Sequence, residues 1–216
     1  MDELAPGLWH WTRQHPEWHP PGFGDEVSSY ALLDDAGLVL VDPLLDGEGD
    51  PVLAELEAQA TGSVRILITM GYHVRSSELI WQRLGPKRSG IYGHANCASR
   101  LEDTSGFTPL AGGETLEGGI RAHSFGSPRR AELAIELPSQ RAIAFGDVIV
   151  ETGTGRLRVW AWGSVKQPWW DERFIPTLRP LAELDVQRVL VTHGAPVLNG
   201  GAKALAAALD AGPWRR

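Results

Sequence analysis

The feature that most constrains the fold of this chain is a series of short apolar runs, each ending in polar or glycine residues. Residues 65–69, 142–145 and 188–192 have the length and aliphatic content of buried strands. An irregular loop follows the first, Gly146-Asp147 follows the second, and the third leads into His193-Gly194. Because α/β proteins usually build sites where strand ends converge, the sequence predicts a site at these positions.

The other segments alternate β-like runs with helices and contain no internal repeat. In chain order, the sequence predicts a hairpin over 29–42 and a helix over 51–60 that starts behind Asp50-Pro51. A second helix is expected over 78–84, with Ser76 or Ser77 as its cap, and β-like runs follow between 120 and 145. The last elements are a helix over 171–184 that its prolines kink or break and a closing helix over 202–209. This order favours two sheets covered by outer helices.

Length and charge narrow the class of protein. A chain of 216 residues that is 43% hydrophobic predicts one domain over residues 1–216. The net charge of -7 and the lack of clustered Lys and Arg argue against a nucleic-acid partner. No apolar stretch reaches the roughly 18 residues of a membrane span, and the first twenty residues do not read as a signal peptide. We therefore expect a cytoplasmic protein without a membrane partner.

Five segments, in their order and spacing, resemble the metallo-β-lactamase superfamily. They are LAPGLW at 4–9, LVDP at 40–43, LIT at 67–69, FGD at 145–147 and VTHG at 191–194. Each segment by itself is weak evidence for the family, whereas the five segments in this order are more specific evidence. The resemblance covers nearly the whole chain and implies an α/β fold, the four-layer αββα sandwich of the metallo-β-lactamase type.

The resemblance also implies a metal site, because family members hold two metal ions, usually zinc, that activate water. Their ligands lie in a Thr-His-x-His-x-Asp-His loop, in a later His-containing turn, in a Gly-Asp turn and at a His near the C-terminus. The loop and the later turn have lost their ligands here, where the matching positions hold Met70, Tyr72, Val74, Arg75 and Ser127. Only Asp147 and His193 remain, and two ligands do not make a dinuclear site.

Two interpretations of the remaining residues stay open. His73 lies one residue from a ligand position, so His73, Asp147 and His193 are candidate ligands of at most one zinc, iron or manganese ion, with Asp147 and His73 as the catalytic candidates. Alternatively, His73 is an ordinary structural histidine and Arg75 pairs with Asp147, which would replace the charge of the metal. Asp42 is expected to orient the loop through hydrogen bonds.

The candidate substrate-binding residues are Trp18, Tyr72, Arg75 and Trp162. Trp18 belongs to an aromatic N-terminal segment that could cover the site, and Trp162 belongs to a second cluster within a chain of nine tryptophans. The alternative for the N-terminal segment is a surface-packed terminal strand and loop. The rings of the second cluster can line a ligand pocket or a homodimer interface, and plain core packing explains them equally well.

Two functions therefore remain. The first is a hydrolase of this superfamily that uses one metal ion, and the second is a metal-free relative that binds a small-molecule ligand or a partner. The sequence has no Gly-x-Ser-x-Gly elbow and no P-loop, so serine-hydrolase and nucleotide-hydrolase chemistry have no support.

Overall fold

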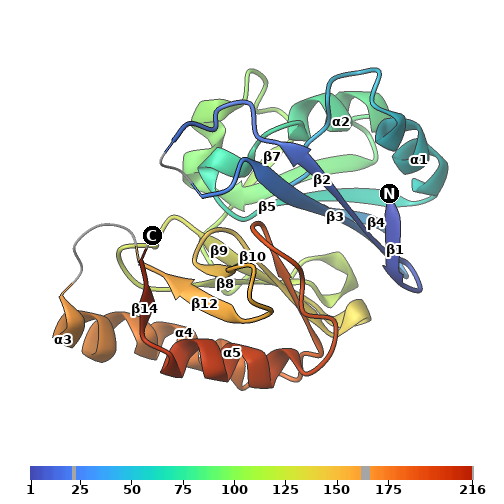
Figure 1. The fold of residues 1–216 in the computed structure, drawn as a ribbon. Helices are drawn as coiled ribbons and strands as arrows, with labels where there is room; N and C mark the ends of the chain where they lie inside the picture. The colour runs from blue at the N-terminus through green and yellow to red at the C-terminus, as the bar shows by residue number, and fades with distance from the viewer. Residues whose placement is uncertain (21–22, 162–165, 216) are drawn as a thin grey trace.

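The computed structural model describes residues 1–20, 23–161 and 166–215. Within them, the chain forms a seven-stranded sheet in the order β1-β2-β3-β4-β5-β6-β7 and a four-stranded sheet in the order β13-β10-β9-β8. A small third sheet has the order β11-β12-β14. Figure 1 shows α1 and α2 on the outer side of the seven-stranded sheet and α4 and α5 on the opposite side of the molecule. The predicted two sheets with outer helices are thus observed.

The elements have the following bounds. The strands are β1 Asp2–Ala5, β2 Leu8–Gln14, β3 Glu26–Asp34, β4 Gly37–Val41, β5 Ser63–Ile68, β6 Ser89–His94, β7 Phe107–Leu110, β8 Arg121–Ser124, β9 Leu133–Leu137, β10 Ala142–Phe145, β11 Ile149–Glu151, β12 Leu157–Trp160, β13 Arg188–Val191 and β14 Pro213–Trp214. The helices are α1 Pro51–Gln59, α2 Ser77–Leu84, α3 Gln167–Trp169, α4 Ile175–Ala182 and α5 Gly201–Asp210.

Side-chain alternation along the strands produces the layers. In β4, Leu38 and Leu40 pack with α1 and α2 side chains, whereas Val39 and Val41 belong to the core between the two large sheets. In β10, Phe145 packs with residues of α4 and α5, and its neighbour Ala144 faces the central core. Because successive side chains of a strand point to opposite faces, a strand buried on both faces is apolar throughout. Three apolar layers therefore separate four layers of secondary structure.

Hydrogen bonds join the two large sheets near the ends of their strands. The backbone N–H of Leu133 donates to the carbonyl of Thr69 at 2.7 Å, and the N–H of Ser28 donates to the carbonyl of Thr192 at 2.8 Å. The buried hydroxyl of Tyr30 donates to the carbonyl of Val191 at 2.8 Å. These bonds hold the carboxyl ends of β5 and β13 in a fixed relation, which positions the loops that follow them.

Several local predictions can be compared with the structure. The hairpin, the α1 helix and the closing helix are confirmed. The predicted serine cap of α2 is wrong: Ser76 is the N-cap residue but makes no capping bond, because its hydroxyl accepts from the N–H of Leu45. The proline-broken helix appears as α3, a π-helical turn over Trp170–Phe174, and α4. No helix among the described residues is both long and apolar enough to cross a bilayer.

Asp50 anchors the start of α1 and carries a testable prediction about stability. Its carboxylate accepts from the N–H of Val52 at 2.9 Å and from Nε and Nη2 of Arg13 at 2.9 and 2.7 Å. Burial raises the pKa of Asp50, but the hydrogen bonds from Arg13, Asp46 and Val52 outweigh it and lower the pKa to about 2. We expect Asp50→Ala to lower the free energy of unfolding by about 2–4 kcal/mol at neutral pH, since a cap and a charged hydrogen bond are both lost.

The same residue gives the effect a pH dependence. The pKa of Asp50 is lower in the folded chain than in the unfolded one, so its stabilisation is complete above pH 4–5, roughly, and is lost as the pH falls toward about 2. Urea unfolding of the wild type and of Asp50→Ala across this range measures the difference. Asp50→Ser is the matched control, because it keeps a cap and removes the ion pair. A difference that does not shrink on acidification would contradict this role.

Candidate functional site

The candidate site lies at the carboxyl ends of parallel strands from both large sheets. Asp42 follows β4 and Thr69 follows the neighbouring β5, with which β4 pairs in parallel. In the other sheet, Asp147 follows β10 and His193 follows β13, and these strands also pair in parallel. The convergence predicted from the strand ends is therefore present.

Asp42 organises the loop after β5. Its carboxylate accepts from the N–H of Thr69 at 2.8 Å, from the hydroxyl of Thr69 at 2.6 Å and from Nδ1 of His73 at 2.9 Å. His73 ends the short 3-10 helix η1 (Gly71–His73) and is buried. The network assigns the Nδ1 proton of His73 to the side of Asp42, so Nε2 is turned toward the site. The expected orienting role of Asp42 matches these contacts.

His73, Asp147 and His193 come together as a chain of side chains. Oδ1 of Asp147 lies 3.4 Å from Nε2 of His73 and 3.5 Å from Nε2 of His193. Burial acts to raise the pKa of Asp147, but the two histidines hold it well below its ordinary value. Burial and the charge of Arg75 act to lower the pKa of His73, yet Asp42 and Asp147 raise it overall. Asp147 is therefore a carboxylate that two imidazoles share at ion-pair distance.

Arg75 enters the same site from a strained position of the loop. Its φ of 45° lies in the left-handed region, which a long side chain rarely adopts. Nη1 donates to the carbonyls of Asp42 and Ser28 at 2.8 and 3.2 Å. Burial lowers the pKa of Arg75, and the nearby charges of Asp42 and Asp147 oppose this effect. Arg75 thus interacts with Asp147 through space, but the direct pair that one interpretation predicted is not formed between these two described residues.

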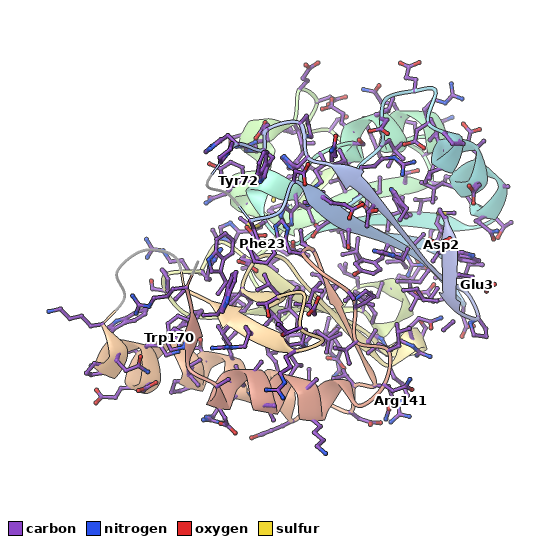
Figure 2. The ribbon with its side chains drawn as sticks, viewed as in Figure 1. Asp2, Glu3, Phe23, Tyr72, Arg141 and Trp170 are labelled. Atoms are coloured by element: carbon purple, nitrogen blue, oxygen red, sulfur yellow. The ribbon has the colours of Figure 1, made fainter. Side chains whose placement is uncertain are left out.

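His73, Arg75, Asp147 and His193 line one cleft, which has a volume of about 390 Å³. All the candidate site residues that the structure describes lie at its wall, and Figure 2 shows Tyr72 and Phe23 at the same end of the molecule. Trp18 and Tyr72 are 40% and 59% exposed, so they form its rim rather than its floor. Trp162 lies outside the described residues. The lining side chains are His15, Glu17, Trp18, His19, Phe23, Val27, Met70, Tyr72, His73, Arg75, Arg129, Asp147, Trp160 and His193.

The sequence did not single out Phe23, Arg129 or Glu132 as site residues, and it noted Trp160 only as part of an aromatic cluster. The ring of Phe23 packs 4.5 Å from that of His193, between centroids, and 5.7 Å from that of Trp160. Burial raises the pKa of Glu132 to about 7, with Arg129 opposing the rise and Asp147 adding to it. The signal that could have identified Arg129 is the Arg-Arg pair beside the turn where a family ligand was expected.

Comparisons with solved structures recover one fold across the whole chain. The DIM-1 metallo-β-lactamase matches with a TM-score of 0.67 and 15% identity, over 97% of this chain and 95% of that one. The chain has the metallo-β-lactamase fold. A metallo-β-lactamase family protein from Thermus thermophilus matches with a TM-score of 0.60 and 21% identity, over 97% and 81%. An archaeal superfamily protein from Sulfolobus tokodaii matches at 0.63 and 12%, over 95% and 85%.

Comparisons by sequence find no match. No family model matches the chain, and no curated protein matches it. The predicted four-layer sandwich is therefore confirmed by the structural matches. Sequence identities of this size establish the fold alone, so the chemistry has to be inferred from the residues of the site.

The pair of metal ions associated with the metallo-β-lactamase fold does not fit these residues. Within residues 1–20, 23–161 and 166–215, no group of three or more His, Cys, Asp and Glu side chains is placed to hold one ion. The imidazole of His73 is instead fixed between two carboxylates, and the buried Arg75 supplies a permanent positive charge beside Asp147. A cation at that point repels a dication. This geometry therefore does not fit the dinuclear site of the family.

Proposed function

We propose that this chain is a metal-independent, ligand-binding protein with the metallo-β-lactamase fold, and that its cleft takes a small organic carboxylate. The observation that carries the proposal is the guanidinium of Arg75. Its Nη1 is anchored to two backbone carbonyls, whereas Nε and Nη2 are shielded from solvent and have no hydrogen-bond partner among the described residues. Buried charged donors left without an acceptor are costly, so this edge of Arg75 calls for an acceptor.

The chain itself illustrates what such an edge binds. In Arg13, Nε and Nη2 donate to the two oxygens of the Asp50 carboxylate at 2.9 and 2.7 Å. The same two nitrogens of Arg75 lack an acceptor among the described residues. Because the planar edge of a guanidinium matches the two oxygens of a carboxylate, Arg75 is suited to bind a carboxylate in the same bidentate way.

The walls of the cleft indicate the rest of the ligand. Trp18, Phe23, Val27 and Trp160 supply apolar surface beside Arg75. Small-molecule sites generally combine such walls with a few polar groups that fix orientation. The ligand that this cleft favours is therefore an organic acid with an apolar or aromatic body.

The side chains of the cleft favour binding over covalent hydrolysis. Its described lining contains no Ser, Thr, Cys or Lys, so the hydroxyl, thiol and amine nucleophiles of covalent catalysis are absent from these residues. The carboxylate of Asp147 is held at low pKa by its two histidines, so it is a poor proton acceptor near neutral pH. These features support a ligand-binding role that keeps the fold without the reaction.

Binding of monocarboxylates tests the proposal. Hexanoate and phenylacetate are titrated into the full chain by calorimetry, and Arg75→Met is expected to weaken their binding by roughly ten- to a hundred-fold, the usual worth of a charged hydrogen bond. Arg75→Lys should recover part of the affinity, because it keeps the charge and loses the planar edge. Arg130→Met is the control, since Arg130 is exposed and does not line the cleft. Equal binding by wild type and Arg75→Met would overturn the proposal.

Metal analysis separates this proposal from the single-metal hydrolase. Protein purified without added metal, and again after incubation with zinc or iron, is analysed for its elemental content. We expect no stoichiometric transition metal in either preparation and no change with His193→Ala. The hydrolase hypothesis requires about one tightly held ion per chain, in an open coordination site, that is lost in His193→Ala. Finding that ion would contradict metal independence.

A further inference from the structure

Arg129 is a second positive side chain at the wall of the cleft, and one of its donors has no partner among the described residues. It lies between β8 and β9, and its Nη1 is 3.4 Å from Oε2 of Glu132, a longer contact than the 2.7 Å between Arg13 and Asp50. Its Nη2 is shielded from solvent and has no hydrogen-bond partner among the described residues. The guanidinium carbon stands 5.2 Å from the centre of the Trp160 ring, which holds the group against the aromatic wall.

Arg129 also stands where the cleft meets a second one. This second cleft has a volume of about 310 Å³ and shares Met70, Tyr72 and Arg129 with the first. Its other polar side chains are Asn96, Arg100 and Glu132. The guanidinium of Arg100 lies 4.1 Å from the centre of the Tyr72 ring and pairs with Glu17 at 3.1 Å. Arg129 is therefore the charged side chain that the two clefts share among the described residues.

We propose that the ligand is an elongated dicarboxylic acid, with one carboxylate on Arg75 and the other on Arg129. This inference rests on the proposed function and specifies the class of ligand. A monocarboxylate satisfies the free edge of Arg75 and leaves the shielded Nη2 of Arg129 without an acceptor. A second carboxylate at the far end of an apolar chain would satisfy both groups, and Phe23 and Trp160 give the same cleft an apolar wall for that chain.

The chemistry distinguishes Arg129 from Arg75 as a specificity-determining residue. Arg75 would bind any acid of suitable shape, so its loss weakens every ligand. Arg129 would contact only the second acidic group, so its loss weakens diacids and leaves monoacids nearly unchanged. Specificity is a difference between affinities, and the ratio of diacid to monoacid affinity isolates this contribution.

A matched series of ligands tests the inference. Calorimetry compares straight-chain dicarboxylates of four to eight carbons with the monocarboxylates of equal length, using the full chain. We expect at least one diacid to bind about ten-fold or more tightly than its monoacid, as a charge-assisted hydrogen bond allows. In Arg129→Leu this preference should disappear while the monoacid affinity stays, and Arg129→Lys should keep part of it. Arg130→Leu is the matched control, and thermal unfolding verifies that each variant is folded.

The outcomes separate the two proposals. If monoacids bind through Arg75 but every diacid binds with equal affinity, or if Arg129→Leu leaves the preference intact, the dicarboxylate inference is wrong and the proposed function stands. If wild type binds no member of either series, both are overturned. A uniform loss of all ligands in folded Arg129→Leu would also overturn the inference, because it would place Arg129 at the first carboxylate.

Discussion

Replacing Asp42 with alanine is expected to lower the free energy of unfolding by about 3–5 kcal/mol, the cost of removing one partner from a buried charged network. The Asp42 carboxylate is the acceptor for the N–H and the hydroxyl of Thr69 and for Nδ1 of His73. All three residues are buried, so water cannot replace it without a rearrangement. Asp42 also has a φ of 48°, a conformation that aspartate tolerates better than alanine. Urea unfolding at neutral pH measures the loss.

Two variants control this experiment. Asp42→Asn keeps the shape, one acceptor oxygen and the tolerance of positive φ, and loses the charge that faces His73, so we expect a smaller loss of about 1–3 kcal/mol. Asp35→Ala changes an exposed aspartate in the turn at the other end of β4 and should stay within about 0.5 kcal/mol of wild type. If Asp42→Ala were no less stable than Asp35→Ala, the network would not hold the loop.

The location of the site could be predicted from the sequence because it depends on strand ends. Thr69, Asp147 and His193 each follow an apolar run. Parallel pairing of β10 with β13 brings the ends before Asp147 and His193 to one edge, and β5, which precedes Thr69, lies in the facing sheet. Parallel strands in a covered sheet leave few other places for polar side chains. The position of His73 could not be predicted from strand ends alone. It depends on the turn of η1, which no periodicity in the sequence indicates.

The direction of Arg75 could not be predicted in the same way. A sequence gives the charge of an arginine, whereas its rotatable side-chain bonds and the φ of 45° decide which groups it reaches. The loop turns the guanidinium toward the carbonyls of Ser28 and Asp42, and one of these belongs to a strand forty-seven residues earlier. Arg129 is a similar case, because its approach to the cleft depends on tertiary packing against Trp160.

The fold shows the same division between local and long-range information. The hairpin, α1 and α5 carry their own patterns, and they were predicted. The small sheet of β11, β12 and β14 was not, because β14 has two residues and gives no period to detect. The N-terminal strand β2 was expected only as a terminal strand and loop, and its seven-residue pairing with β3 makes it an inner strand of the large sheet.

The pair of Asp34 and Arg65 carries the second large prediction, because it is an ion pair in which both side chains are only 3% exposed. Nη1 and Nη2 of Arg65 donate to the two oxygens of Asp34 at 2.9 and 2.6 Å, and Nη1 also donates to the carbonyl of Glu117. Asp34→Ala leaves the buried guanidinium without its counter-charge, so we expect the free energy of unfolding to fall by about 3–5 kcal/mol. Chemical denaturation measures this change.

A double-mutant cycle then separates the ion pair from the turn. Asp34 also accepts from the N–H groups of Ala36 and Gly37, so part of the loss belongs to the β3–β4 turn that the sequence predicted. Asp34→Asn keeps an acceptor for these groups and removes the charge. Because Arg65→Met removes the buried cation, Asp34→Asn with Arg65→Met should be more stable than the sum of the two single changes predicts, by about 1–3 kcal/mol. Strict additivity would mean that the two buried charges do not depend on each other.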